Sequence, residues 1–276
     1  MGSPVAFVLG GGGVRGAVQV GMVRALLDHG VIPDLVIGAS IGAVNGALLA
    51  ADPGPGVVER LTAAWDSPAA RAVYGDPIAR QVHRLARTRT HLVSDVPLRH
   101  LLEHHLGDDA RFEDLAVPLH VVAANIERAA ETWFRSGPLV PAVLASAAVP
   151  GVLPPAVVDD LHYLDGGIVN SIPLGEAVRL GARTVYVLQV GTAERELSAP
   201  RRPIDTAKVA FEVARRHRFT RELAAVPDGV RVHVLPSGGG IEGDEKVMSY
   251  RRMGPTSRRI ERAYAAGTAF LAGLDP

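Results

Sequence analysis

The sequence predicts an α/β fold, a three-layer sandwich in which a mostly parallel central sheet is flanked by helices. First, short valine-rich apolar runs alternate with segments of helical periodicity along most of the chain. Second, these runs lack the polar alternation of half-exposed strands, which is typical of strands buried on both faces. Third, two runs end in glycine-containing turns that open directly into a helical pattern. Such turns lie at the carboxyl ends of parallel strands, where proteins of this class bind ligands.

Six apolar runs are the predicted strands. They span Val5–Leu9, Leu35–Ile37, Leu119–Ala124, Thr132–Phe134, Thr184–Val190 and Val230–Leu235. Eight segments with apolar residues at helical spacing are the predicted helices. They span Ala17–His29, Ala43–Ala51, Val57–Trp65, Leu98–Leu106, Leu139–Ala147, Leu174–Leu180, Ala207–Ala224 and Pro255–Leu271. A chain of this length can bury a large core, so we expect a single domain over residues 1–276.

Three segments break the regular pattern. Residues 66–97 combine prolines, turn formers and arginines, and they predict a helical excursion or, alternatively, a cap over the site. Residues 193–205 and 236–250 predict loops. The motifs that carry chemistry all fall between about residues 5 and 190.

The composition excludes several classes of protein. Basic and acidic residues balance at 29 each, so the chain lacks the positive charge that nucleic-acid binding requires. Without cysteine there is no disulfide, thiol nucleophile or cysteine-based metal site. The apolar stretches Leu35–Ala51 and Val140–Val158 are too interrupted to supply the roughly 20 apolar residues of a membrane span. The N-terminus carries no signal-peptide pattern, which predicts a cytoplasmic protein for which peripheral membrane contact stays open.

The most informative motif is Gly38-Ala39-Ser40-Ile41-Gly42, directly after the run Leu35–Ile37. A serine with glycines two residues to either side can occupy a sharp strand-to-helix turn that exposes its hydroxyl to a substrate. The free N–H groups of the following helix favour a developing negative charge at that point. Because the chain is rich in glycine, the motif gains its meaning from its position between a strand pattern and a helical pattern.

A second glycine loop, Gly10–Gly16, follows the run Val5–Leu9 and opens a helical pattern. Successive glycines can turn their backbone N–H groups toward one point and form a concavity for an anion. Beside an exposed serine, this concavity can hold the oxyanion of an attacked carbonyl group. The loop also fits a plain turn, and its Gly-x-Gly-x-x-Gly spacing fits a dinucleotide fingerprint. The dinucleotide interpretation requires an acid at the end of the next strand, whereas Asp34 precedes that strand.

Asp165 begins a third motif, Asp165-Gly166-Gly167, after the short run His162–Leu164. In isolation, an aspartate before two glycines usually indicates only a turn. It matters here because a serine hydroxyl is a poor nucleophile until a neighbouring base accepts its proton. Burial in a water-poor site would raise the basicity of an aspartate.

In this order the three motifs resemble those of the patatin-like phospholipase family. The segment Ala145–Pro155, ahead of the aspartate, resembles the family's Ala-Ser-x-Ala-x-Pro block, and Asn170-Ser171-Ile172-Pro173 also fits. Each motif is weak alone, but their combination and order are specific. The resemblance spans about residues 5–190, and it implies the patatin-like version of the α/β sandwich.

The resemblance implies a serine acyl hydrolase that cleaves lipid carboxyl esters, like a phospholipase A or a lysophospholipase, without cofactor or metal. By position, Ser40 is the nucleophile and Asp165 the general base of a Ser-Asp dyad that forms an acyl-serine. Gly11, Gly12 and Gly13 would form the oxyanion hole, supported by Arg15. An acyltransferase or a small-ester esterase would use the same dyad, and a non-catalytic lipid-binding relative would have lost turnover.

Histidines and arginines offer alternatives outside this resemblance. His100 and His104 lie four apart in a helical pattern and could pair on a metal, but a solvated helix face is the simpler interpretation. A serine–aspartate–histidine triad would recruit His217 or His233. The basic run Arg215–Arg221 predicts a solvated helix face or, less simply, a contact for anionic lipid headgroups.

Overall fold

The computed structural model describes residues 4–54, 56–75, 78–190, 196–201, 203–239 and 256–274. Within these ranges, eight strands form one sheet in the order β5-β6-β3-β2-β1-β7-β8, with β4 added to β3. The strands are β1 (Val5–Leu9), β2 (Leu35–Ala39), β3 (Leu119–Asn125), β4 (Ala130–Phe134), β5 (Ala156–Val158), β6 (Leu161–Asp165), β7 (Thr184–Leu188) and β8 (Arg231–Val234). The ladders joining β3, β2, β1, β7 and β8 are parallel, whereas β4, β5 and β6 pair antiparallel. The sheet is therefore mixed but mostly parallel, as predicted.

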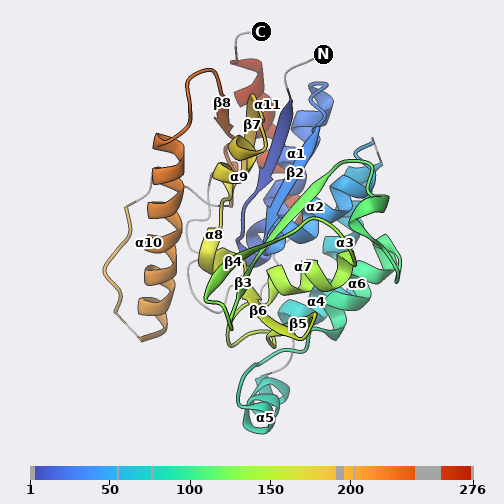
Figure 1. The fold of residues 1–276 in the computed structure, drawn as a ribbon, viewed down its shortest axis with the longest axis vertical. Helices are drawn as coiled ribbons and strands as arrows, with labels where there is room; N and C mark the ends of the chain where they lie inside the picture. The colour runs from blue at the N-terminus through green and yellow to red at the C-terminus, as the bar shows by residue number, and fades with distance from the viewer. Residues whose placement is uncertain are drawn as a thin grey trace.

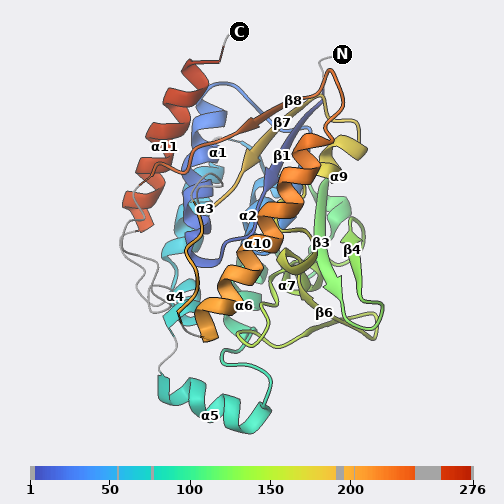
Figure 2. The same ribbon diagram turned by 90° about the vertical axis from the view of Figure 1, so that its left-hand side faces the viewer.

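Helices cover both faces of this sheet, with α8, α9 and α10 on one side and most of the others opposite (Figures 1 and 2). The helices are α1 (Val18–Asp28), α2 (Ile41–Ala51), α3 (Val57–Asp66), α4 (Pro68–Gly75), α5 (Ile78–Thr88), α6 (Val96–Leu106), α7 (Leu139–Ala147), α8 (Gly167–Asn170), α9 (Leu174–Arg179), α10 (Pro203–Ala224) and α11 (Thr256–Ala272). Two short 3-10 helices, η1 (Gly13–Ala17) and η2 (Phe112–Asp114), complete the described elements. The predicted three-layer sandwich is thus confirmed.

The central strand β1 shows how the sequence builds two apolar layers at once. Its alternate side chains point to opposite faces of the sheet. Phe7 and Leu9 join the core beneath α1, α2 and α11, whereas Ala6 and Val8 join the core beneath α9 and α10. All four side chains are fully buried, which explains why the strand reads as a continuous apolar run.

The sequence missed the strands β5 and β6 and the helix α8, and it predicted α4 and α5 only together, as a helical excursion without separate bounds. Two of these elements are too short to show a periodicity, since β5 has three residues and α8 has four. Residues 66–97, the predicted excursion or cap, contain α4 and α5; α4 packs against α6, and α5 projects from the end of the molecule (Figure 1). The predicted loops at 193–205 and 236–250 and the start of the last predicted helix lie partly outside the described residues. No helix in the described ranges is both long and apolar enough to cross a bilayer.

Candidate active site

The ends of β2 and β6 meet along one edge of β3. Ala39, the last residue of β2, pairs with Val122, and Asp165, the last residue of β6, pairs with the adjacent Ala123. Because β4 occupies the other edge of β3, β2 and β6 run toward each other on the same edge. Ser40 directly follows β2. Sheet pairing therefore brings its side chain to Asp165, although 125 positions separate them in the chain.

Ser40 lies in a strained turn between β2 and α2. Its φ of 55° and ψ of −126° belong to a region that residues other than glycine rarely adopt. The flanking glycines permit this turn: a Cβ on Gly38 would lie 2.6 Å from Ala43 Cα, and one on Gly42 would overlap the backbone oxygen of Leu9. Both glycines are thus needed, because the first turn of α2 lies against the end of β2 at Gly38 and against the backbone of β1 at Gly42.

Ser40 and Asp165 are joined by a short hydrogen bond. Ser40 Oγ donates to Asp165 Oδ2 at 2.5 Å, and the Gly167 amide donates to Asp165 Oδ1 at 2.7 Å. Burial raises the pKa of Asp165 to about 6, although the hydrogen bonds from Ser40 and Gly167 act against this shift. A carboxylate with a raised pKa accepts a proton more readily, so the pair is suited to activating a serine hydroxyl.

The carboxyl end of α7 fixes both members of this pair. Ser146 Oγ accepts a hydrogen bond from the Ser40 amide at 2.9 Å, and the Ser146 carbonyl accepts one from the Gly166 amide at 3.0 Å. The Ala148 carbonyl accepts one from the Asp165 amide at 2.9 Å. Ser146 is completely buried. The sequence motif Ala145–Pro155 includes Ser146 but assigned it no role, because the partners of Ser146 come from two distant segments of the chain.

The glycine loop lies against the serine, and its geometry corrects one part of the expected oxyanion hole. The Gly11 amide donates to the Ser171 carbonyl at 2.9 Å, so this N–H is engaged within the fold. Gly11 instead provides space, because a Cβ there would lie 3.2 Å from Ser40 Cβ. The backbone N–H groups of Gly12 and Gly13 donate hydrogen bonds to no described backbone acceptor. They therefore remain the candidate donors to the oxyanion.

Two further residues border the loop. Arg15 lies half-buried in η1, and its amide closes the turn by donating to the Gly12 carbonyl at 3.3 Å. Its supporting role stays a prediction. Ser171 was not singled out from the sequence, yet its buried Oγ has no hydrogen-bond partner in the described structure and lies 3.1 Å from where a Gly11 Cβ would be.

The residues required by the alternative mechanisms lie elsewhere. Asp34 accepts the Val5 amide at 2.8 Å, at the amino ends of β1 and β2, so it is at the wrong end of the sheet for a ribose-binding acid. His233 lies in β8, three strands from β2, and His217 is exposed on α10. Neither histidine is a hydrogen-bond partner of Ser40 in the described structure.

His100 and His104 were the histidine pair considered as a metal site. The His104 ring instead meets the ring of the neighbouring His105 edge to face, with centroids 5.0 Å apart. Across the described residues, no group of three or more histidine, aspartate or glutamate side chains is placed to hold a metal ion.

The basic run on α10 is only in part the solvated face that we expected: His217 and Arg221 are exposed, but three of its arginines are paired within the fold. The Arg215 side chain is only 3% exposed and pairs with Glu212, which also pairs with Arg216. Burial would raise the pKa of Glu212, but the hydrogen bonds and charges of the two arginines outweigh it and hold the pKa at about 2. Arg218 reaches Glu131 on β4 at 2.7 Å. These arginines form ion pairs within the fold, because acids one helical turn away or on β4 face them.

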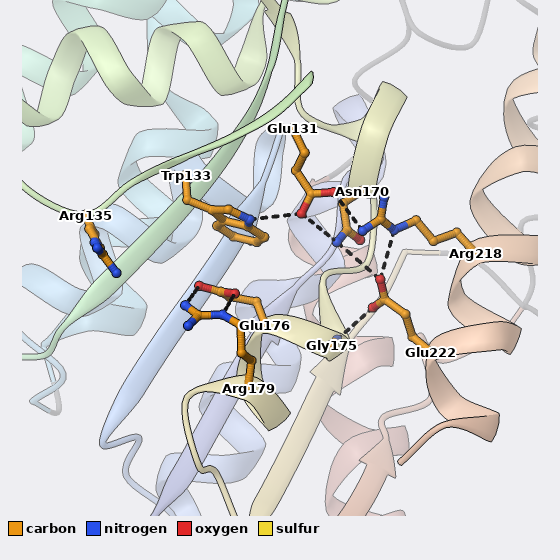
Figure 3. Close-up of a pocket in the computed structure, with 9 residues that line it drawn as sticks. All are labelled: Glu131, Trp133, Arg135, Asn170, Gly175, Glu176, Arg179, Arg218 and Glu222. Atoms are coloured by element: carbon orange, nitrogen blue, oxygen red, sulfur yellow. Dashed lines mark hydrogen bonds and ion pairs between the residues drawn. The ribbon is translucent and has the colours of Figure 1, made fainter. Parts of the chain in front are cut away.

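A cavity of about 530 Å³ lies between β4, α8, α9 and α10 (Figure 3). Its lining consists of Glu131, Trp133, Arg135, Asn170, Gly175, Glu176, Arg179, Arg218 and Glu222. Most of its charges are paired within the wall, as Figure 3 shows for the Arg179–Glu176 pair. Neither Ser40 nor Asp165 lines it, so this cavity is distinct from the Ser40–Asp165 pair.

Comparisons with known proteins agree with the motifs. The model of the patatin-like phospholipase family matches residues 7–178. Patatin-like phospholipase domain-containing protein ZK370.4 of Caenorhabditis elegans is 34% identical over 195 residues, which are 70% of this chain and 14% of that protein. Human patatin-like phospholipase domain-containing protein 6 is 33% identical over the same length, again 70% of this chain and 14% of the relative. The chain therefore corresponds to a small part of these relatives.

A solved structure shows similarity over a longer stretch. The crystal structure of VipD from Legionella pneumophila aligns with 98% of this chain and 67% of its own chain, at 16% identity and a TM-score of 0.48.

Proposed function

This chain belongs to the patatin-like phospholipase family, and from that premise we propose that it hydrolyses carboxylic esters of lipids through an acyl-serine on Ser40. The observation that carries the proposal is the 2.5 Å hydrogen bond from Ser40 Oγ to the buried carboxylate of Asp165. A serine needs a base within hydrogen-bonding reach, and Asp165 is the base that Ser40 contacts.

The proposed reaction begins when Asp165 accepts the Ser40 proton as Oγ attacks the ester carbonyl carbon. The carbonyl oxygen becomes negatively charged, and the amides of Gly12 and Gly13 donate hydrogen bonds to it. As the tetrahedral intermediate collapses, Asp165 returns the proton to the leaving alcohol. Asp165 then accepts a proton from a water molecule that attacks the acyl-serine, and it returns that proton to Ser40 Oγ as the fatty acid is released.

Two features of the fold support this division of roles. The strained turn at Ser40 holds Oγ in one orientation, so little ordering remains to be done when the substrate binds. The near-complete burial of Asp165 removes water that would otherwise weaken its basicity. Transfer of the acyl group to an alcohol, or cleavage of a small ester, would use the same two residues.

A fluorophosphonate probe tests the proposal directly, because it labels only an activated serine. We expect labelling of the native protein and none of Ser40→Ala, together with release of fatty acid from defined phospholipids and lysophospholipids. A soluble p-nitrophenyl ester and an added alcohol acceptor would identify the small-ester and transferase alternatives. Labelling that persists in Ser40→Ala would reject Ser40 as the nucleophile.

A further inference from the structure

Helix α5 has two different faces and is exposed on both. Taken at 100° per residue, Ala79, Val82, Leu85 and Ala86 form one apolar face, and all four side chains are exposed. Val82 is 60% exposed and Leu85 42%. In an ordinary surface helix this face would be packed on the core, so its exposure needs a physical reason.

The opposite face of α5 is basic. It carries Arg80, His83, Arg84 and Arg87, and the chain from residue 78 to residue 94 contains no acidic side chain. The nearest acids in the sequence are Asp76 and Asp95. The whole protein is neutral, so this concentration of positive charge is local.

The position of α5 relates it to the candidate active site. It projects from the end of the molecule opposite the chain termini, which is the end where β1 and β2 finish (Figures 1 and 2). In the described structure α5 packs closely against no other element. Its base is fixed, since the guanidinium of Arg84 donates to the Leu92 carbonyl at 2.8 Å, and the Val93 amide donates to the Val152 carbonyl at 2.8 Å.

We propose that α5 lies in the interface of an anionic phospholipid membrane, with Val82 and Leu85 among the acyl chains and the exposed Arg87 at the headgroups. An amphipathic helix with a basic polar face binds such an interface by burying apolar area and by attraction to anionic lipids. This placement would hold the carboxyl ends of the strands, and hence Ser40, toward the membrane. A second copy of the chain fits this surface less well, because symmetric pairing would bring together two copies of a basic helix whose segment 78–94 contains no acid.

The proposal extends the proposed lipid-ester hydrolysis, but its test does not depend on turnover. Sedimentation with vesicles is measured on the Ser40→Ala protein, using phosphatidylcholine with and without phosphatidylglycerol. We expect binding to the anionic vesicles, weakened by added salt. We expect Val82→Asp/Leu85→Asp to lower the binding constant roughly tenfold or more, and Arg87→Glu to lower it severalfold.

The chain provides a matched control for the apolar substitution. Leu223 on α10 is 41% exposed, close to the 42% of Leu85, but it lies near the end of α10 away from α5 (Figure 1). We expect Leu223→Asp to bind vesicles like the parent. With Ser40 restored, Val82→Asp/Leu85→Asp should hydrolyse a soluble p-nitrophenyl ester at the native rate and lose activity on anionic vesicles.

Three results would overturn the proposal. The first is equal vesicle binding by Val82→Asp/Leu85→Asp and the parent, or no binding by the parent. The second is a dimer in solution that these substitutions dissociate, which would make a second copy the occupant. The third is a large loss of thermal stability in the double variant, which would show that the apolar face packs within the protein. Failure of hydrolysis in the native protein, with vesicle binding intact, would reject only the proposed function.

Discussion

Asp165 is buried where an ionised carboxylate is unfavourable, and the proposed reaction depends on that ionised form. Its pKa is raised from 3.8 to about 6, chiefly by burial. The folded protein therefore binds a proton at Asp165 in a pH range where the unfolded chain has already lost it. Stability from this residue is highest at low pH and decreases as the pH rises from about 4 to about 6. Activity should change in the opposite direction, because the base must be deprotonated.

The pH dependence of hydrolysis tests the base. We expect kcat/KM on a soluble ester to be half-maximal near the pKa of about 6 and to fall about tenfold per pH unit well below it. A rate that stays flat to pH values well below 5, or that rises in acid, would contradict a carboxylate base with a raised pKa.

Asp165→Asn separates activity from stability. The amide keeps the shape of the side chain but cannot accept the serine proton, so we expect hydrolysis to fall on the order of 10³-fold or more. The same variant should be more stable at pH 8 than the native protein, by up to about 3 kcal/mol, because no buried charge has to form. Chemical denaturation at pH 8 and pH 4 measures this gain, which should nearly vanish at pH 4.

At the scale of secondary-structure elements, the proposed dyad depends on α7 as much as on the two strands that carry it. The Oγ of Ser146 satisfies the Ser40 amide, and its carbonyl satisfies the Gly166 amide. The strained turn and the Asp165 strand end are thus fixed to one helix terminus. Strain at Ser40 persists only while such contacts hold it, so α7 acts as a positioning element.

Ser146→Ala should weaken this arrangement. It leaves the buried Ser40 amide without an acceptor, which costs about 1–3 kcal/mol. We expect kcat to fall roughly tenfold, at about 1.4 kcal/mol per tenfold, with KM on a soluble ester little changed. Ser67→Ala is the matched control, since Ser67 Oγ also accepts a hydrogen bond from a backbone amide, that of Ala70 at 3.1 Å, but at the start of α4. Equal kcat values for both variants would remove Ser146 from the positioning role.

At the scale of the whole molecule, the carboxyl-terminal helix closes one face of the sandwich. Helix α11 lies outside the matched residues 7–178, yet it packs along α1 (Figure 2). The two backbones touch at Gly21, where a Cβ would overlap the carbonyl oxygen of Ile260. This close approach buries Ile260 and Ala263 against the core that also holds α2.

Gly21→Ala should therefore lower the stability of the fold and leave the proposed reaction unchanged. The added methyl forces α11 away from α1, and we expect a loss of about 2–3 kcal/mol and a Tm lower by roughly 5–10 °C. Gly46→Ala in α2 is the control, because its Cβ would meet only side-chain carbons, Val36 Cγ1 at 3.2 Å and Leu119 Cδ1 at 3.4 Å, and no backbone atom. A thermal melt in which both variants shift equally would show that the α1–α11 contact is not the reason.

The sequence alone determined the fold class, the central strands, and the identity of Ser40 and Asp165 as candidates. The apolar composition of a run such as Val5–Leu9 by itself predicts that the strand is buried on both faces. The glycine spacing around Ser40 reflects a local backbone requirement. The tertiary structure decided the rest: the meeting of β2 and β6 on β3, the engagement of the Gly11 amide by Ser171, and the internal ion pairs of Arg215. These features depend on contacts between segments far apart in the chain, and local periodicity contains no information about which distant partner a polar group will find.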